Sequence, residues 1–288
     1  MAVPGVQAFF DAATSSFSYV VWDGGSGRAA VIDPVLDFDA SAARTASVGA
    51  DRIVAFVRER GLALDWVLET HVHADHLSAA QHIKSSLGGR TGIGGHVTAV
   101  QKTFGALFNA GPGFARDGSQ FDHLFADDEA FLVGDIEALA LATPGHTPAC
   151  VSYLIGDALF VGDTLFMPDY GSARCDFPGG DARTLYRSVQ KLYALPESTR
   201  MFLCHDYKAP GRDAYVSETT VGAQRAGNLH IRAGVSEADF VALRESRDAT
   251  LSAPRLLLPS VQVNMRAGRL PAVEDNGVAY LKLPLNQV

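Results

Sequence analysis

The residue types that bind metal ions are concentrated in the segment Thr70-His71-Val72-His73-Ala74-Asp75-His76, directly after an apolar run. Neutral imidazole combined with carboxylate suits Zn²⁺ or Fe²⁺, whereas carbonyls and carboxylates alone suit Ca²⁺ or Mg²⁺. His71 and His73 are two residues apart, so in an extended backbone they point to the same side. A solvated His-rich loop is the alternative, but the full HxHxDH pattern after a strand-like run favours a metal site.

Further residues of the same types follow later strand-like runs. Residues 136–142 precede His146, residues 158–161 precede Asp163, and residues 201–204 precede His205. Any one of these histidines alone is more often a surface or hydrogen-bonded core residue. However, rigid strands that place ligands on adjoining loops are the expected construction of a preorganised site. The joint pattern therefore predicts one metal site assembled from several strand ends.

Composition narrows the class of protein. The chain has 288 residues, 47% hydrophobic and 19% charged, which is typical of a globular protein with a sizeable core. Its net charge of −8 argues against nucleic acid as a partner, because phosphate binding needs a basic surface. The sequence contains no apolar run of about 18 residues, so we expect no membrane-spanning helix. Three cysteines without a CxxC pair, and no secretion-type N-terminus, lead us to expect a cytoplasmic protein.

Strand-like and helix-like segments alternate without a linker between two folding units. The predicted helices cover residues 50–60, 77–87, 97–108, 181–192 and 236–247. The predicted strands cover residues 18–22, 29–32, 66–69, 131–133, 136–142, 152–155, 158–161 and 201–204. Residues 91–128 otherwise read as irregular, and residues 253–288 as an extended tail. The pattern indicates an α/β fold with two sheets between helices, in one domain over residues 1–288 with a C-terminal extension from about residue 211 packed on the core.

The motif series resembles a known superfamily. HxHxDH, then TPGHT, then GD and a later His are similar to the motifs of the metallo-β-lactamase superfamily over about residues 7–210. The resemblance implies an αββα four-layer sandwich with the metal site at one edge of the two sheets. Residues 171–180 (GSARCDFPGG) and His205-Asp206-Tyr207 further resemble the ETHE-type persulfide dioxygenases, and the tail at residues 259–264 with Pro271 resembles their bacterial branch.

That resemblance implies a reaction and a cofactor. Enzymes of this type oxidise glutathione persulfide with O₂ and water to sulfite and glutathione, using one mononuclear non-haem Fe(II) per chain. The implied ligands are His71, His146 and Asp163, a two-His, one-carboxylate set that leaves coordination positions open. The remaining ligand-type residues would orient these ligands and bound water; they are His73, Asp75, His76 and His205.

The implied glutathione contacts are Thr147, Arg174 and Tyr207. An arginine beside the site also makes physical sense, because glutathione carries two carboxylates that a guanidinium binds in a bidentate manner. The alternative for Arg174 is a structural ion pair with Asp176 or Asp169.

The same residues permit a different enzyme. His71, His73 and His146 can bind one metal while Asp75, His76 and His205 bind a second, with Asp163 as the bridge. Two metals arranged in this way activate a water molecule for hydrolysis. The alternative function is therefore a dinuclear glutathione thioester hydrolase similar to glyoxalase II. A metal-dependent sensor without turnover is disfavoured, because every ligand position is intact.

Two features depart from the resemblance. Residues 37–51 are longer than the corresponding loop of the shorter animal and plant members, and we expect them to cover one edge of the fold or to join the interface of a homodimer. Cys175 stands where Thr is commoner, which alters the shape expected for the thiol pocket. No rhodanese-like extension is present, so a sulfurtransferase partner would be a separate chain.

Overall fold

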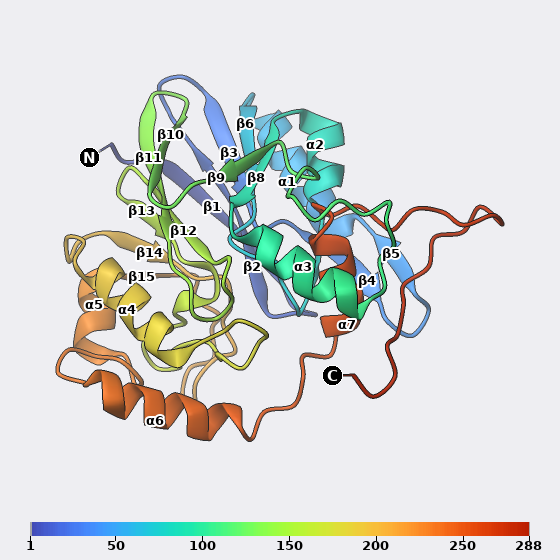
Figure 1. Ribbon diagram of the computed structural model, residues 1–288. Helices are drawn as coiled ribbons and strands as arrows, with labels where there is room; N and C mark the ends of the chain where they lie inside the picture. The colour runs from blue at the N-terminus through green and yellow to red at the C-terminus, as the bar shows by residue number, and fades with distance from the viewer. Residues whose placement is uncertain (1, 288) are drawn as a thin grey trace.

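The first half of the chain forms a sheet covered by helices. The computed structural model describes residues 2–287. The first six-stranded sheet has the order β1-β2-β3-β6-β8-β9, made of β1 (Gly5–Asp11), β2 (Ser16–Trp22), β3 (Arg28–Ile32), β6 (Ala63–Leu68), β8 (Arg90–Gly94) and β9 (His123–Phe125). On this side of the molecule lie α1 (Val48–Glu59), α2 (Ala80–Leu87) and α3 (Val97–Leu107) (Figure 1).

The second half repeats this arrangement. Its six-stranded sheet runs in chain order, through β10 (Glu129–Val133), β11 (Ile136–Ala142), β12 (Val151–Ile155), β13 (Ala158–Phe160), β14 (Arg200–Phe202) and β15 (Glu218–Thr220). The accompanying helices are α4 (Ala182–Tyr193), α5 (Val221–Gly227) and α6 (Glu237–Asp248), with a short 3₁₀ turn at Gly162–Thr164. The predicted αββα sandwich is therefore confirmed (Figure 1).

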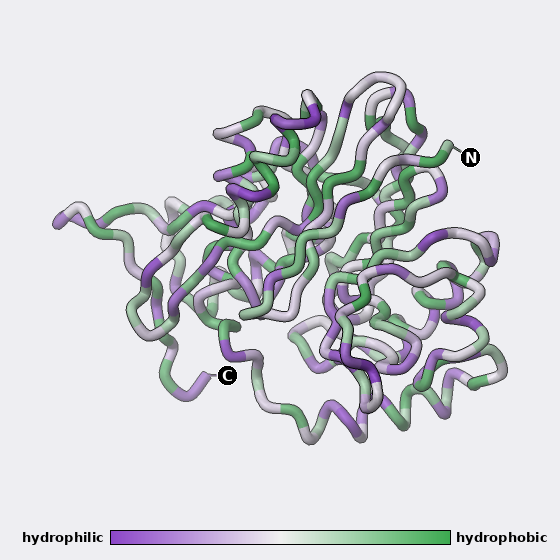
Figure 2. Tube along the Cα trace, turned by 180° about the vertical axis from the view of Figure 1, so that it is seen from behind, coloured by the Kyte–Doolittle hydropathy of each residue, from purple (hydrophilic) through white to green (hydrophobic). Residues whose placement is uncertain are grey.

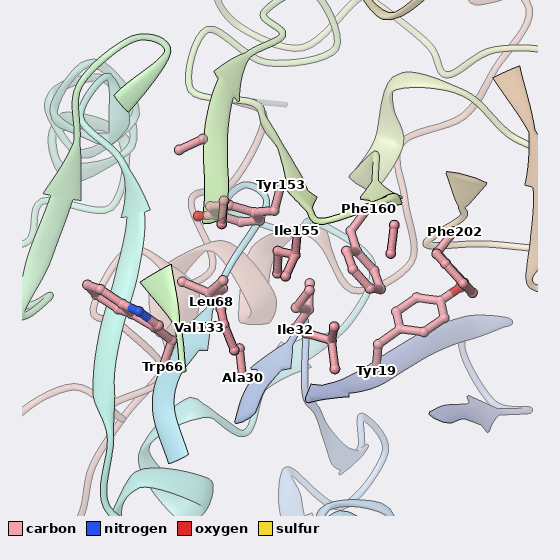
Figure 3. Packing of buried hydrophobic residues seen from close by; sticks show 14 of the residues in the cluster. Tyr19, Ala30, Ile32, Trp66, Leu68, Val133, Tyr153, Ile155, Phe160 and Phe202 are labelled. Atoms are coloured by element: carbon pink, nitrogen blue, oxygen red, sulfur yellow. The ribbon is translucent and has the colours of Figure 1, made fainter. Parts of the chain in front are cut away.

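Alternation along the strands explains the four layers. Tyr19 and Val21 of β2 face the second sheet, whereas Val20 between them packs against the helices on the outer face. Successive side chains of a strand point to opposite faces, so a strand buried on both faces is apolar throughout. Figure 3 shows the inner contact, with Ile32 and Leu68 from the first sheet meeting Ile155 and Phe160 from the second.

Several elements were missing from the sequence-based prediction. Residues 5–11 form the edge strand β1, and the supposedly irregular residues 91–128 contain β8 and β9. The predicted helix at residues 77–87 begins as the short strand β7 (Leu77–Ser78) before α2 starts. Short strands such as these lack a distinct local pattern, because pairing with neighbouring strands rather than local preference fixes them.

Residues 37–51 take part in a third, small sheet. There β4 (Val35–Asp39) pairs on one side with β5 (Arg44–Ala46) and on the other with β7. This segment is thus attached directly to the residues that follow HxHxDH, and it ends in the first turn of α1.

The C-terminal tail is only partly extended, which corrects the prediction for residues 253–288. Residues 257–264 form a buried helix, α7 (Leu257–Asn264), whose Val261 packs with α3. After α7 the chain runs away from the body and returns as a narrow arm (Figures 1 and 2). This arm exposes hydrophobic side chains such as Val273 and Leu283, which are 66% and 65% exposed. The proline content therefore correctly predicted the extended arm, but it led the sequence-based prediction to miss helix α7.

Helix α6 is tied to the loop at residues 171–176 by a buried ion pair. Arg244 pairs with Asp248 at 2.7 Å, and its Nη1 also donates to the carbonyl of Ser172 at 3.0 Å. The carboxylate of Asp248 in turn accepts from the backbone N–H of Cys175 at 2.8 Å. Both charged side chains are less than 9% exposed, so each depends on the other for charge balance.

We therefore expect Arg244→Ala to lower the free energy of unfolding by about 3–5 kcal/mol, because it leaves the buried Asp248 carboxylate unpaired. Urea unfolding followed by circular dichroism measures the effect. Arg225→Ala is the matched control, since Arg225 pairs with an exposed Glu197 and should cost less than about 1 kcal/mol. Equal effects of the two substitutions would contradict the structural role of Arg244.

Candidate metal centre

Four loops at the ends of strands bring the ligand-type residues together. The loop after β6 carries HxHxDH, and the loop between β11 and β12 carries His146. Asp163 follows β13 and His205 follows β14, and these two strands are parallel neighbours. Because parallel strands end at the same edge of a sheet, their following residues necessarily lie close together.

Asp163 lies at the centre of the group. Its Oδ2 is 3.6 Å from Nε2 of His146 and 3.9 Å from Nε2 of His71. Its Oδ1 is 3.3 Å from Nε2 of His205, which is also 3.3 Å from Oδ2 of Asp75. The donor atoms of His71, His146 and Asp163 all lie within 4.8 Å of one another. The structure thus brings the predicted triad together and places the second group of residues beside it.

The buried donor atoms fit a metal ion. Five of them have no hydrogen-bond partner among the described residues: Nε2 of His71, Nδ1 of His73, Nε2 of His76, Nε2 of His205 and Oδ1 of Asp163. Buried polar atoms in folded proteins are nearly always satisfied, so such a cluster needs an explanation. Imidazole nitrogens and a carboxylate that converge in this way are the donor set of Zn²⁺ or Fe²⁺.

Hydrogen bonds at the far side of each imidazole orient the free nitrogens. The Nδ1–H of His146 donates to the backbone carbonyl of Arg174 at 2.7 Å, which leaves the lone pair of Nε2 available. Nε2 of His73 lies 2.9 Å from Oδ1 of Asp33 and 3.4 Å from Oε2 of Glu69. Asp33 also accepts hydrogen bonds from the backbone and hydroxyl of Thr70.

Asp33 and Glu69 were not predicted as site residues. Both are buried, and with His73 they form a further group of closely spaced donor atoms. The signal for Asp33 was available, because it directly follows β3 just as the predicted residues follow their strands. Glu69 was predicted only as the last residue of the strand at residues 66–69. Its position beside His73 became visible only in the folded structure.

Charge in this buried region is shared between carboxylates and histidines. Burial, and then the neighbouring His73, hold the pKa of His71 well below its usual value. Burial opposes a charge on His73, but Asp33, Cys204 and Glu69 together outweigh burial and raise the pKa of His73 well above its usual value. For His205, burial is likewise outweighed by Asp163, Cys204 and Asp75 together, so its pKa is also raised. Metal binding releases protons from its ligands, so a cation here would replace charge that protonated histidines otherwise supply.

A cavity of about 220 Å³ opens onto this centre. Asp75, His146 and Asp163 line it together with an aromatic group: Phe166, Tyr170, Phe177 and Tyr207. Three arginines also line it, namely Arg174, Arg244 and Arg247. Such a cavity, apolar over much of its wall with a few charged groups, suits a small anionic ligand.

The three predicted glutathione contacts have different positions. Tyr207 lines the cavity and stacks on His205, with ring centroids 5.5 Å apart. Arg174 lines the cavity too, but its guanidinium already binds both carboxylate oxygens of Asp176 at 2.6 Å. Thr147 is buried, its hydroxyl lies 3.1 Å from Sγ of Cys150, and it is not among the residues that line the cavity.

The cysteines are unpaired and buried. Cys175 contributes its backbone N–H to Asp248, and burial raises the pKa of its thiol well above the usual value. The thiol of Cys204 lies within 4.8 Å of donor atoms of Asp163 and His205, and burial raises its pKa as well. Neutral thiols are poor nucleophiles, so neither residue has the character of a reactive cysteine.

None of the described helices has the length and apolar composition needed to cross a membrane.

Comparison with known proteins agrees with this geometry. The family model described as the metallo-beta-lactamase superfamily matches residues 12–205. A probable metallo-hydrolase of Burkholderia pseudomallei is 56% identical over 98% of this chain and 99% of its own length. Glyoxylase B2 of Dictyostelium discoideum is 46% identical, over 98% of this chain and 97% of that protein.

Two further similarities refine the picture. A beta-lactamase hydrolase-like protein of Xylella fastidiosa is 52% identical over 98% of this chain, which spans only 65% of that longer protein. The crystal structure of ETHE1 from Myxococcus xanthus has a TM-score of 0.73 and 29% identity, covering 92% of this chain and 100% of that one. The chain therefore belongs to the metallo-beta-lactamase superfamily of metal-binding enzymes, and its similarity to ETHE1 supports an ETHE-type assignment within it.

Proposed function

We propose that this protein is a persulfide dioxygenase, which converts glutathione persulfide, O₂ and water into glutathione and sulfite. One Fe(II) per chain would be held by His71, His146 and Asp163. The observation that carries the proposal is this two-His, one-carboxylate group, two members of which line a cavity with aromatic and arginine walls. Similarity to the mitochondrial persulfide dioxygenase ETHE1 of Homo sapiens, which is 29% identical over 91% of this chain and 88% of its own length, supports the same reaction.

Each part of the reaction has a counterpart among the residues of this chain. Bound iron would supply the O₂ chemistry, through coordination positions that three protein ligands leave open. His146 is fixed in orientation by the carbonyl of Arg174, so the ligand set is preorganised. Asp75 and His205, 3.3 Å apart, can hold a water molecule or pass a proton beside Asp163. The aromatic rings of Phe177 and Tyr207 supply apolar wall to the cavity beside these residues.

Arg174 and Arg247 are the candidates for binding the carboxylates of glutathione. Arg174 lines the cavity, but its Nε and Nη2 donate to Asp176 and its Nη1 donates to the carbonyl of Ser252, so much of its capacity is used within the protein. Arg247 borders the cavity without an ion pair among residues 2–287. A guanidinium without a carboxylate partner beside a cavity is a suitable site for an anionic ligand.

A dinuclear thioester hydrolase is the second candidate. Free nitrogens on His73, His76 and His205 point to room for a second metal ion. The names of two relatives, a probable metallo-hydrolase and Glyoxylase B2, favour this alternative. The number of metal ions per chain therefore distinguishes the two functions.

We predict one iron per chain in protein purified without oxygen, measured by plasma emission spectrometry. His71→Ala, His146→Ala and Asp163→Ala should each lose the iron, because each removes one of only three protein ligands. His76→Ala is the discriminating variant and should keep it, since His76 lies outside the triad.

The hydrolase would give a different pattern. Two tightly bound zinc ions, the loss of one of them in His76→Ala, and hydrolysis of glutathione thioesters would together overturn the dioxygenase proposal. Oxygen uptake on glutathione persulfide is the corresponding measurement of activity.

We predict that Arg174→Ala lowers kcat/KM for glutathione persulfide by about 10- to 150-fold, the effect of losing a charge-assisted contact of about 1.5–3 kcal/mol. Iron content should stay unchanged, because His146 bonds to the backbone of Arg174 and not to its side chain. Asp176→Asn serves as the control, since it weakens the internal ion pair and leaves the guanidinium in place. If Asp176→Asn were as damaging as Arg174→Ala, the role of Arg174 would be structural.

A further inference from the structure

The last residue of α7 reaches into the HxHxDH loop. Nδ2 of Asn264 donates to the backbone carbonyl of His73 at 2.9 Å and to that of His76 at 2.8 Å. Its Oδ1 accepts from the backbone N–H of Ser78 at 2.7 Å. Asn264 is 4% exposed, so these three bonds use its side-chain amide within the protein interior. Helix α7 lies beyond residues 12–205, the part of the chain that the superfamily model matches.

The contact extends to the polar network behind His73. The hydroxyl of Ser78 donates to Oε1 of Glu69, and Oε2 of the same carboxylate lies 3.4 Å from Nε2 of His73. Asn264 therefore holds the loop through its main-chain carbonyls, while Asp33 holds the imidazole of His73 and Glu69 lies beside it. Ser78, which belongs to β7, bonds to both Asn264 and Glu69 and so connects the two residues.

The end of α7 is itself fixed to the body of the protein. Gln81 of α2 donates to the carbonyl of Ala267 at 2.8 Å, and Gln101 of α3 donates to that of Met265 at 2.9 Å. Gly268 has a φ of +80° and lies so close to Ser78 that an added Cβ would be 2.9 Å from its carbonyl oxygen. The amide of Asn264 thus starts from a rigid position and does not depend on the loop for its own placement.

The HxHxDH loop needs such support. Residues 71–76 belong to no helix or strand, so no ladder of backbone hydrogen bonds fixes them. This loop nevertheless has to present the ring nitrogen of His71 to the metal and to keep the imidazoles of His73 and His76 beside it. A small rotation of the peptide groups at His73 and His76 would shift the loop and His71 with it, and a displacement of about 1 Å is enough to impair a preorganised site.

We propose that Asn264 is a positioning residue of the metal centre, which fixes the backbone of the HxHxDH loop at His73 and His76 and thereby the placement of the ligand His71 in the same loop. The C-terminal segment is then part of the metal site although it supplies no ligand. This inference depends on a metal centre but not on the persulfide reaction, so it stands or falls separately from the proposed dioxygenase activity.

The test is metal affinity in Asn264→Ala, measured by titrating the metal-free protein with Co²⁺ in competition with a chromophoric chelator. We expect the affinity to fall by about 10- to 100-fold, the usual range for residues that orient ligands. The visible absorption of bound Co²⁺ should also change, because the ligand geometry relaxes. Asn264→Asp is the second variant: it retains the shape and the acceptor for Ser78 but loses the donor to the two carbonyls.

Gln262→Ala is the matched control on the same helix. Gln262 is 2% exposed. Its side-chain NH₂ donates to the carbonyl of Lys282 and its side-chain oxygen accepts from the N–H of Lys282, so it ties α7 to the C-terminal arm and not to the metal loop. Its substitution should lower stability while leaving Co²⁺ affinity and spectrum as in the wild type. Wild-type Co²⁺ binding in either Asn264 variant, or an equal loss in Gln262→Ala, would overturn the proposal. If Asn264→Ala does not fold, the Asn264→Asp titration alone decides.

Discussion

Buried charge is the constraint on which this structure depends. Asp33, Glu69 and Asp163 are carboxylates with little contact with water, and they stand among imidazoles that are equally buried. Removing such groups from water costs several kcal/mol each unless opposite charge and hydrogen bonds compensate. The protein compensates in two ways: by pairing His73 with Asp33, and by pointing free nitrogens at a shared space where a cation fits.

The sandwich makes this concentration of polar groups tolerable. Two sheets bury their inner faces against each other, and the apolar contact between them supplies the main stabilisation. The polar residues gather at one edge, beyond the last apolar residue of each strand, where Leu68 gives way to Glu69 and Phe160 is soon followed by Asp163. The core is therefore undisturbed by the site, while the ends of its strands hold the site in place.

The C-terminal residues complete what the sandwich begins. Helix α6 anchors the loop at residues 171–176 through Arg244 and Asp248, and that loop provides both a cavity wall and the carbonyl that orients His146. Helix α7 reaches the opposite side of the centre through Asn264. The two C-terminal helices thus control the cavity and the metal loop separately, which gives residues beyond the superfamily match a direct influence on the site.

The sequence by itself determined the sandwich and the candidate ligands, because the apolar strands and the strand-end histidines are local patterns of residue type and spacing. It did not determine α7, the short strands β4, β5, β8 and β9, or the partners of the ligands. Asp33 and His73 are 40 residues apart in the sequence, and Asn264 and His76 are 188 residues apart. No local sequence pattern can predict contacts over such separations. Arg174 shows the same limit at short range, since its spacing from Asp176 allowed either a ligand contact or an internal ion pair. Only the tertiary structure showed which of these pairs form, because hydrogen bonding and charge pairing depend on distances that the packed sheets and helices set.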